Sequence, residues 1–228
     1  MCGRYIVRLL GESMRDWNVS APENWIKVSY NVAPTQDVPI IRVREGARQG
    51  AVVRWGLIPY FAGGEPPKYS TINARVETIE TAPAWRGPWS RGQRCLQLCS
   101  GFYEWHQDEH GRKVPYFVSL ADQDTFAFAS LWDRSRKPDG TRIESCALVT
   151  LPANELMHDL HNTGANPHRM PAILRKEDHE AWLQGTIEEA KAVLRQYPSD
   201  VMSAHPVSAR VNAPKNDDEK LKIGRAHV

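Results

Sequence analysis

The chain has 228 residues, of which 41% are hydrophobic and 25% charged, which fits an ordinary soluble globular protein long enough to bury a sizeable core. Its 29 Lys and Arg residues against 27 Asp and Glu residues give a net charge of +2, so a uniformly positive nucleic-acid-binding surface is excluded and any basic surface must be local. No apolar run approaches the roughly 20 residues that span a bilayer, and the basic N-terminus lacks the apolar stretch of a signal peptide, which predicts a cytoplasmic protein without a membrane partner.

The chain begins with "MCGRY", so that a cysteine stands directly behind the initiator methionine. If Met1 is removed, Cys2 presents a free α-amine and a thiol on adjacent carbons. No internal cysteine can offer such a 1,2-aminothiol, and the segment therefore raises the question of a special chemistry at the N-terminus.

Short β-type runs recur along most of the chain, bounded by turn sequences such as "DEHGRK" and "KPDGTR". They occupy residues 2–9, 37–44, 51–58, 95–105, 115–120, 125–132 and 142–151. This pattern predicts a mostly antiparallel sheet folded on itself.

Three helices are expected near the C-terminal end, over residues 152–162, 176–185 and 186–198. Asn154 is a suitable N-cap for the first, Gly185 ends the second, and Thr186 with Glu189 has capping-box spacing at the start of the third. With no repeat or linker, we expect one domain over residues 1–228, in which the polar tail from about residue 215 frays.

The segment "TINARVET" places Asn73 and Arg75 two residues apart, hence on one side of an extended chain. Both side chains suit substrate binding. An asparagine turn followed by a surface arginine explains the same pattern, and the segment alone does not separate the two interpretations.

Aromatic and basic residues alternate in "APAWRGPWSRGQR". Trp85 and Trp89 could stack on bases while Arg86, Arg91 and Arg94 bind phosphates. The alternative is a pair of core tryptophans with arginines reaching outward to solvent.

Glu104 closes a run of aromatic and apolar residues in "GFYEWHQ". A carboxylate in such surroundings is unfavourable unless it is paired or protonated, and burial raises its pKa into the range that suits an acid or base. The alternative is a glutamate at a strand end that faces water.

Cys95, Cys99 and Cys146 lie in apolar runs and are expected to be buried thiols. Cys95 and Cys99 lack a second ligand pair at the spacing of a zinc finger. We therefore predict neither a metal site nor a cofactor.

Three histidines occur in "LMHDLHNTGANPHRMPAIL". His158 and His161 are three residues apart, whereas the usual zinc-binding helix has histidines four apart with a glutamate between them. The spacing therefore favours one histidine acting as an acid or base over a metal pair.

Seven motifs in this order together resemble the SOS-response-associated peptidase (SRAP) family. They are "MCGRY" at 1–5, "YNVAP" at 30–34, "WGLIP" at 55–59, "INARVET" at 72–78, "GFYEW" at 101–105, "HRMPAIL" at 168–174 and "HPVS" at 205–208. The resemblance implies an α+β fold in which a barrel-like, mostly antiparallel sheet surrounds a central cleft and a few helices flank it.

The resemblance also implies single-stranded DNA as the partner, and covalent crosslinking of abasic sites through Cys2. By the same resemblance, Asn73 and Glu104 match catalytic positions of the family, and Arg4 and Arg75 are expected near the substrate. We add Arg86 and Arg169 to the arginines expected near the DNA strand.

The histidine is ambiguous, because the family has His-x-Arg-Met-Pro and here Pro167 occupies the histidine position. Counting from the strand end at residue 150 favours His161, with residues 162–168 as an insertion and His168 as the rival.

Two other functions fit parts of the sequence. A cysteine peptidase acting in trans would use Cys2, His161 and Glu104 as a triad-like set. A noncatalytic nucleic-acid-binding module would not need Cys2 at all. The family name further raises cleavage of the protein's own Met1–Cys2 bond, and no obligate protein partner is implied.

Overall fold

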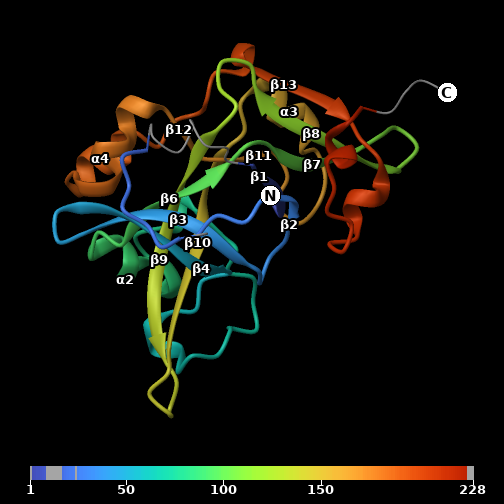
Figure 1. Ribbon diagram of the computed structural model, residues 1–228. Helices are drawn as coiled ribbons and strands as arrows, with labels where there is room; N and C mark the ends of the chain where they lie inside the picture. Colours follow the sequence, from blue (N-terminus) through green and yellow to red (C-terminus); the bar gives the residue numbers. More distant parts are fainter. Residues whose placement is uncertain (1, 9–16, 24, 225–228) are drawn as a thin grey trace.

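A closed five-stranded barrel forms the centre of the computed structural model, which describes residues 2–8, 17–23 and 25–224 (Figure 1). Its strands pair in the ring β9–β10–β4–β3–β6–β9, in which only the β4–β10 pair is parallel. They are β3 (Asp37–Arg44), β4 (Ala47–Trp55), β6 (Arg94–Cys99), β9 (Phe126–Arg136) and β10 (Arg142–Pro152). The ring buries an apolar core and confirms the α+β, barrel-like fold expected from the sequence.

A second, antiparallel sheet packs against the barrel in the order β13–β8–β7–β1–β2. Its strands are β1 (Arg4–Val7), β2 (Ser29–Val32), β7 (Phe102–Gln107), β8 (Lys113–Leu120) and β13 (Met202–Pro206). Tyr5 on β1 joins the two sheets, because its ring packs edge-on against Trp55 and Phe128 and its hydroxyl accepts a hydrogen bond from Gln97. This contact fixes the strand that follows Cys2 against the barrel wall.

The predicted run over residues 95–105 is two strands rather than one. Gly101 separates β6 from β7 with φ +141°, a backbone conformation that side-chain-bearing residues rarely adopt. A Cβ atom there would lie 2.3 Å from the Phe117 ring. The chain therefore turns at Gly101 from the barrel into the second sheet, which carries Glu104 across to the strand beside β1.

Short elements complete the sheets and connect them. The remaining strands are β5 (Asn73–Arg75), β11 (Arg169–Pro171) and β12 (Ile173–Leu174). The 3-10 helices are η1 (Tyr60–Ala62), η2 (Val76–Thr78), η3 (Lys176–Asp178), η4 (Ser199–Val201), η5 (Ala209–Asn212) and η6 (Glu219–Lys222). Sequence periodicity missed the short strands, since two to five residues are too few to show alternation.

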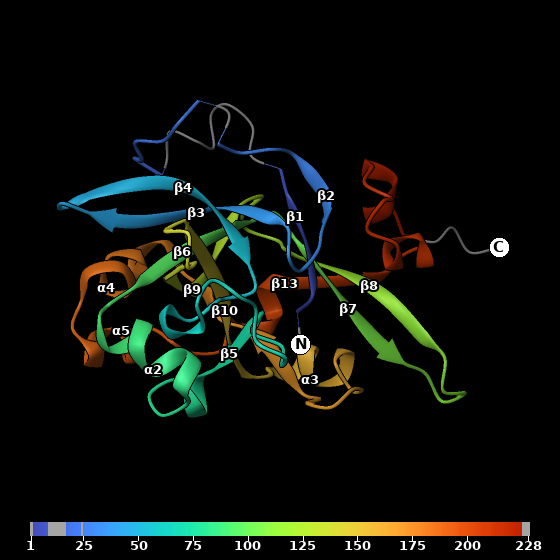
Figure 2. The same ribbon diagram turned by 90° about the horizontal axis from the view of Figure 1, so that it is seen from below.

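Among the described residues, four α-helices flank the sheets: α2 (Pro83–Ser90), α3 (Glu155–Leu160), α4 (His179–Gln184) and α5 (Ile187–Ala192). The predicted caps are confirmed, because Asn154 accepts from the Met157 N–H, Gly185 is the C-cap of α4, and Thr186 and Glu189 form a capping box. Helix α2 was not predicted. Figure 2 shows α2, α4 and α5 on one side of the barrel and α3 near β7.

The described part of the C-terminal tail is packed through Leu221 in η6, which is buried. Residues 225–228 lie outside the described residues, so fraying there stays a prediction. Across the described part of the chain, no helix has the length and apolar character that a membrane crossing requires.

Candidate active site

Asn73 lies directly against Cys2. Strand β5 runs parallel to β10 with Asn73 opposite Leu148, and the Asn73 Nδ2 atom donates a hydrogen bond of 3.1 Å to the Cys2 carbonyl oxygen. Asn73 Oδ1 is buried and has no hydrogen-bond partner in the described part of the chain. The side chain thus orients Cys2 with one end and leaves an acceptor at the other, which can receive an N–H or O–H group of a substrate.

Glu104 is buried beside the same end of β1. Strand β7 pairs with β1 so that Tyr103 stands opposite Arg4, and Glu104 is 2% exposed. Burial raises the pKa of Glu104 to about 7. Burial, and second the negative charge of Glu104, raise the pKa of the Cys2 thiol, so this charge acts directly at the cysteine.

His161 ends α3, which packs against β7. The backbone N–H of Arg169 donates to its Nδ1 atom at 3.1 Å, and this places the proton of the neutral ring on Nε2. Burial, and second the positive charge of the amino terminus, lower the pKa of His161 to about 4. His161 is therefore neutral near pH 7, while Glu104 is partly protonated.

His168 lies outside this cluster. Its ring stacks on that of His158 with centroids 3.9 Å apart, and its backbone N–H donates to the His161 carbonyl oxygen at 2.7 Å. His161 is thus buried, whereas His168 is half-buried and stacks on the exposed His158 ring. Of the two histidines, His161 is the buried one, at 5% exposure, and the charge of the amino terminus acts on its pKa.

The segment after His161 is fastened to the strand that carries Glu104. Asn162 accepts a hydrogen bond from the Gln107 N–H and donates one to the Gln107 carbonyl oxygen, both at 2.9 Å. His106 Nδ1 also lies 3.0 Å from the Asp159 carbonyl oxygen. These contacts hold the end of α3 against β7 and so fix His161 relative to Glu104.

The four arginines expected near DNA lie in different settings. Arg4 donates to the carbonyl oxygens of Val211 and Asn212 and to Asn31 Oδ1, so it ties β1 to η5. Arg75 is exposed beside Asn73.

The tryptophan-rich segment forms α2, which packs against β9, on a different side of the molecule from β7 (Figures 1 and 2). Arg86 is exposed on this helix, whereas Trp85 and Trp89 are buried in the core. The second interpretation of this segment, core tryptophans with outward arginines, therefore describes these three residues.

Arg169, which is mostly buried, forms an ion pair with Glu77, whose side chain is 47% exposed. Its guanidinium bonds to both carboxylate oxygens of Glu77 and donates to the Thr150 carbonyl oxygen at 2.8 Å. The same residue supplies the N–H that binds His161 Nδ1. The pair thus connects "INARVET" with "HRMPAIL" and holds the backbone that orients the histidine.

We expect Glu77→Ala to destabilise the protein by about 1–3 kcal/mol, because the mostly buried Arg169 guanidinium then loses its carboxylate partner. Urea unfolding measures the change. Glu109→Ala, which removes an 86% exposed carboxylate, is the matched control and should stay within about 0.5 kcal/mol of wild type. Equal stability of Glu77→Ala and the control would contradict a structural role for the pair.

Two exposed aromatic residues in η1 were missed by the sequence analysis. Tyr60 and Phe61 are 58% and 55% exposed and meet edge to face at 5.4 Å. The Arg91 guanidinium lies 5.1 Å from the centre of the Tyr60 ring. The sequence signal for this surface was a pair of adjacent aromatic residues directly after "WGLIP". Together with Arg91, the two rings offer a surface on which planar groups can stack.

Comparison with known proteins identifies close similarities over most of the chain. The family model described as SOS response associated peptidase (SRAP) matches residues 1–214. The abasic site processing protein YoqW of Bacillus subtilis is 36% identical, covering 97% of this chain and 98% of its own. The abasic site processing protein HMCES of Gallus gallus is 31% identical, covering 88% and 67%.

Solved structures show the same fold. A protein from Bordetella bronchiseptica superimposes with a TM-score of 0.79 at 28% identity, covering 91% of this chain and all of its own. A protein from Bacteroides thetaiotaomicron gives a TM-score of 0.76 at 28% identity, covering 86% and 85%. From the family match and these relatives, the chain belongs to the SRAP family.

Proposed function

We propose that this protein acts in DNA damage processing by forming a covalent crosslink between Cys2, after removal of Met1, and the aldehyde of an abasic site in single-stranded DNA. The observation that carries the proposal is the hydrogen bond from Asn73 to Cys2, with Glu104 and His161 in electrostatic reach of the same end of the chain. The names of the relatives, abasic site processing proteins, support the substrate.

The α-amine of Cys2 starts the reaction. An α-amine has an ordinary pKa near 7.7–8.0, so part of it is neutral at physiological pH and adds to the ring-opened aldehyde of the abasic deoxyribose. The carbinolamine that forms must lose a hydroxyl group as water. Protonated Glu104 is suited to donate that proton, because its pKa near 7 keeps the acid form populated.

The thiol of Cys2 completes the crosslink. The S–H bond adds across the imine, sulfur bonding to carbon and the hydrogen ending on nitrogen, which closes a five-membered thiazolidine. The product is protein plus DNA minus one water. Neutral His161 is suited to accept the thiol proton and pass it on. Such a relay is needed because burial raises the pKa of the Cys2 thiol.

We expect Tyr60→Ala and Phe61→Ala each to weaken binding of undamaged single-stranded DNA by about 1–3 kcal/mol, the usual contribution of one aromatic side chain stacked on a base. Both rings are exposed in the folded protein, so their removal leaves the core intact. Fluorescence anisotropy with a labelled strand measures the change. Ile223→Ala, which removes a 60% exposed apolar side chain, is the control, and equal affinities in all three variants would contradict stacking here.

Hydrolytic chemistry belongs to the proposal only as cleavage of the Met1–Cys2 bond or release of the protein from its adduct. A cysteine peptidase acting in trans is less well supported, because it would make no use of the free α-amine that only an N-terminal cysteine offers beside its thiol. We place the protein in the cytoplasm, with DNA as partner and with no cofactor or obligate protein partner.

Detection of a heat-stable adduct with a strand that carries one abasic site tests the proposal. An adduct that forms equally with an undamaged strand, or without Cys2, would contradict it.

A further inference from the structure

A groove opens in the barrel wall between β4 and β10. These parallel strands pair only at Arg54–Ser145 and Trp55–Cys146 and diverge toward Ala47 and Arg142. The groove has a volume of about 570 Å³ and is lined mainly by Arg44, Val52, Arg54, Arg134, Arg142 and Glu144. We call it the β4–β10 groove. It contains none of the residues assigned above to catalysis or DNA binding.

Carboxylates do not balance the arginines of this groove. Glu144 accepts from Arg42 at 2.8 Å and from Arg134 at 2.7 Å, so one carboxylate serves two guanidinium groups. Arg54 donates a hydrogen bond to the Gly56 carbonyl oxygen rather than to a carboxylate. Arg44 and Arg142 are exposed.

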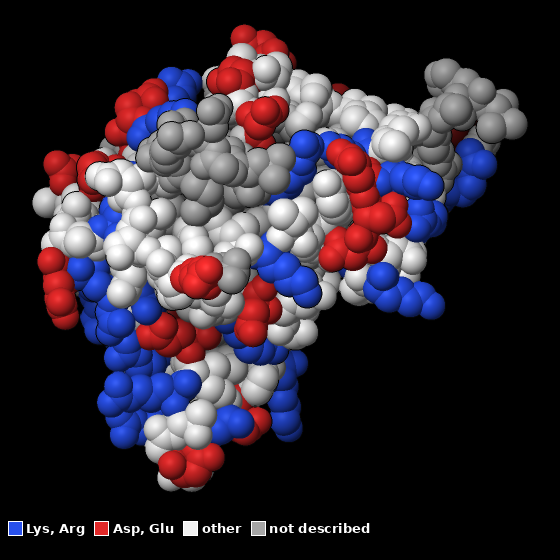
Figure 3. Space-filling view, viewed as in Figure 1, with Lys and Arg blue, Asp and Glu red and all other residues white. Residues whose placement is uncertain are grey.

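The charge of the groove therefore exceeds that of the whole molecule. Counting Arg42 below it, five arginines stand against Asp37 and Glu144, an excess of three positive charges on a chain whose net charge is +2. Figure 3 shows Lys and Arg side chains gathered over the β9–β10 region at the lower end of the molecule. Such a concentration attracts a polyanion.

We propose that the β4–β10 groove binds the phosphate backbone of the DNA strand held at Cys2, on nucleotides remote from the abasic site. This inference rests on the proposed function. Guanidinium groups bind phosphate through paired N–H donors, and Arg44 and Arg142 project from the two sides of the groove with their side chains exposed.

The register of β10 sets the distance from the catalytic residues. Leu148 stands opposite Asn73, whereas Glu144 and Arg142 come earlier on the same strand, about 13 and 20 Å away at about 3.3 Å per residue. Phosphates advance by about 3.4 Å along the helix axis on each strand of a duplex, so four to six or so separate the two places in that geometry. A strand of about four nucleotides centred on the abasic site has about two on each side and therefore ends before Arg142.

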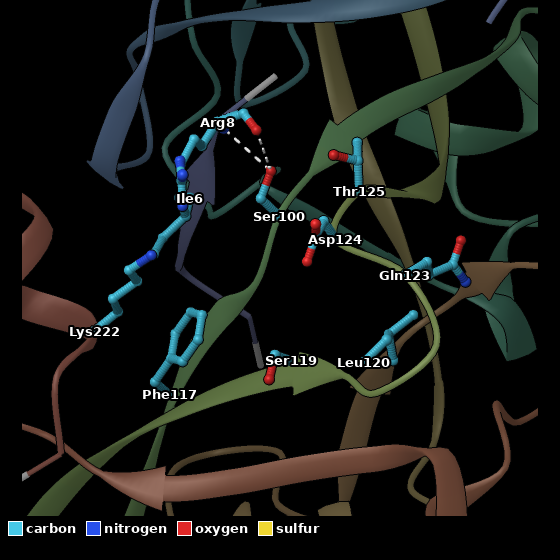
Figure 4. A pocket seen from close by; sticks show the side chains of 10 residues that line it. All are labelled: Ile6, Arg8, Ser100, Phe117, Ser119, Leu120, Gln123, Asp124, Thr125 and Lys222. Atoms are coloured by element: carbon cyan, nitrogen blue, oxygen red, sulfur yellow. Dashed lines mark hydrogen bonds between the residues drawn. The ribbon is translucent and has the colours of Figure 1, made fainter. Parts of the chain in front are cut away.

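A second hollow, seen in Figure 4, is less suited to phosphate. It lies beside Ile6 and Arg8, toward the end of β1 that is remote from Cys2. Its two cations, Arg8 and Lys222, both lie near the Glu219 carboxylate, at 3.8 and 3.1 Å, and Asp124 adds a further negative charge to its lining.

The test compares long and short strands. Fluorescence anisotropy measures the affinity of the double variant Arg44→Gln/Arg142→Gln for undamaged single strands of about 16 and about 4 nucleotides. These lengths bracket common site sizes of single-strand-binding proteins. We expect about tenfold weaker binding of the long strand near 0.1 M salt, and a salt slope lower by about 1.4, since each lost phosphate contact removes about 0.7. Binding of the short strand should not change.

Arg175→Gln/Lys191→Gln, which removes two exposed cations outside the groove, is the matched control. The proposal would be overturned if the double arginine variant bound the long strand as tightly as wild type does, or if it lost the same affinity for both lengths. An equal loss of long-strand affinity in the control variant would overturn it as well. Adduct formation on a short abasic strand reports the proposed function separately. If wild type makes no adduct but the effect of strand length is present, the crosslinking proposal fails, whereas the proposal that the groove binds DNA stands.

Discussion

Cys2→Ala is expected to abolish the heat-stable adduct with abasic DNA. The variant keeps a free α-amine, so it can still form an imine with the aldehyde, but it has no thiol to close the ring. Loss of the adduct should be complete, whereas binding of undamaged strands should change little, because Cys2 is 0% exposed and its thiol bonds only to the Arg4 carbonyl oxygen within the described residues.

Cys2→Ser separates the two steps of the reaction. It preserves the size of the side chain and the amine, and we expect an imine that borohydride traps but heating reverses. Denaturing gels after heating, with and without borohydride, distinguish the outcomes. A heat-stable adduct in Cys2→Ala would mean that another nucleophile reacts, and a noncatalytic binding module would show no adduct in any form.

Glu104→Gln is expected to slow adduct formation about 100-fold at pH 6, within the range of about 10²–10⁴ that a general acid contributes. Glutamine fills the same space and accepts hydrogen bonds but cannot donate the proton that the leaving hydroxyl group needs. The measurement is the single-turnover rate of adduct formation with a short abasic strand.

The pH dependence of the rate of adduct formation shows whether Glu104 acts as an acid or as a base. Its pKa is raised to about 7, so the acid form predominates below pH 7 and disappears above it. The ratio of the wild-type rate to the Glu104→Gln rate should therefore fall as pH rises through 7. His161, with a pKa near 4, stays neutral over this range and does not contribute to the change. A ratio that rises above pH 7 would mean that the carboxylate acts as a base.

The fold was largely predictable because its long strands are regular. Strand β3 matches its predicted run, and the helix caps at Asn154 and Thr186 follow from hydrogen bonds within the first turn of each helix. The strand pattern alone did not predict how the barrel closes, since the parallel β4–β10 pair joins residues about 90 positions apart, and a barrel-like sheet was expected only through the family resemblance. The division at Gly101 also depends on how closely Phe117 approaches.

The candidate site was predictable in part. The free amine and thiol of Cys2 follow from its position alone, and the buried setting of Glu104 follows from its aromatic neighbours. The settings of Arg4 and Arg169 could not be foreseen, because their partners lie 207 and 92 residues away in sequence. The stacked position of His168 on His158 could likewise not be foreseen, because it depends on how the chain folds between residues 158 and 168.

The most direct test is the intact mass of the protein after incubation with a single strand that carries one abasic site. The protein that begins at Cys2 should gain the mass of the DNA minus one water, and the adduct should survive heating. A form that keeps Met1 should gain nothing stable, because it lacks the aminothiol. No stable adduct from protein confirmed to begin at Cys2 would contradict the crosslinking function.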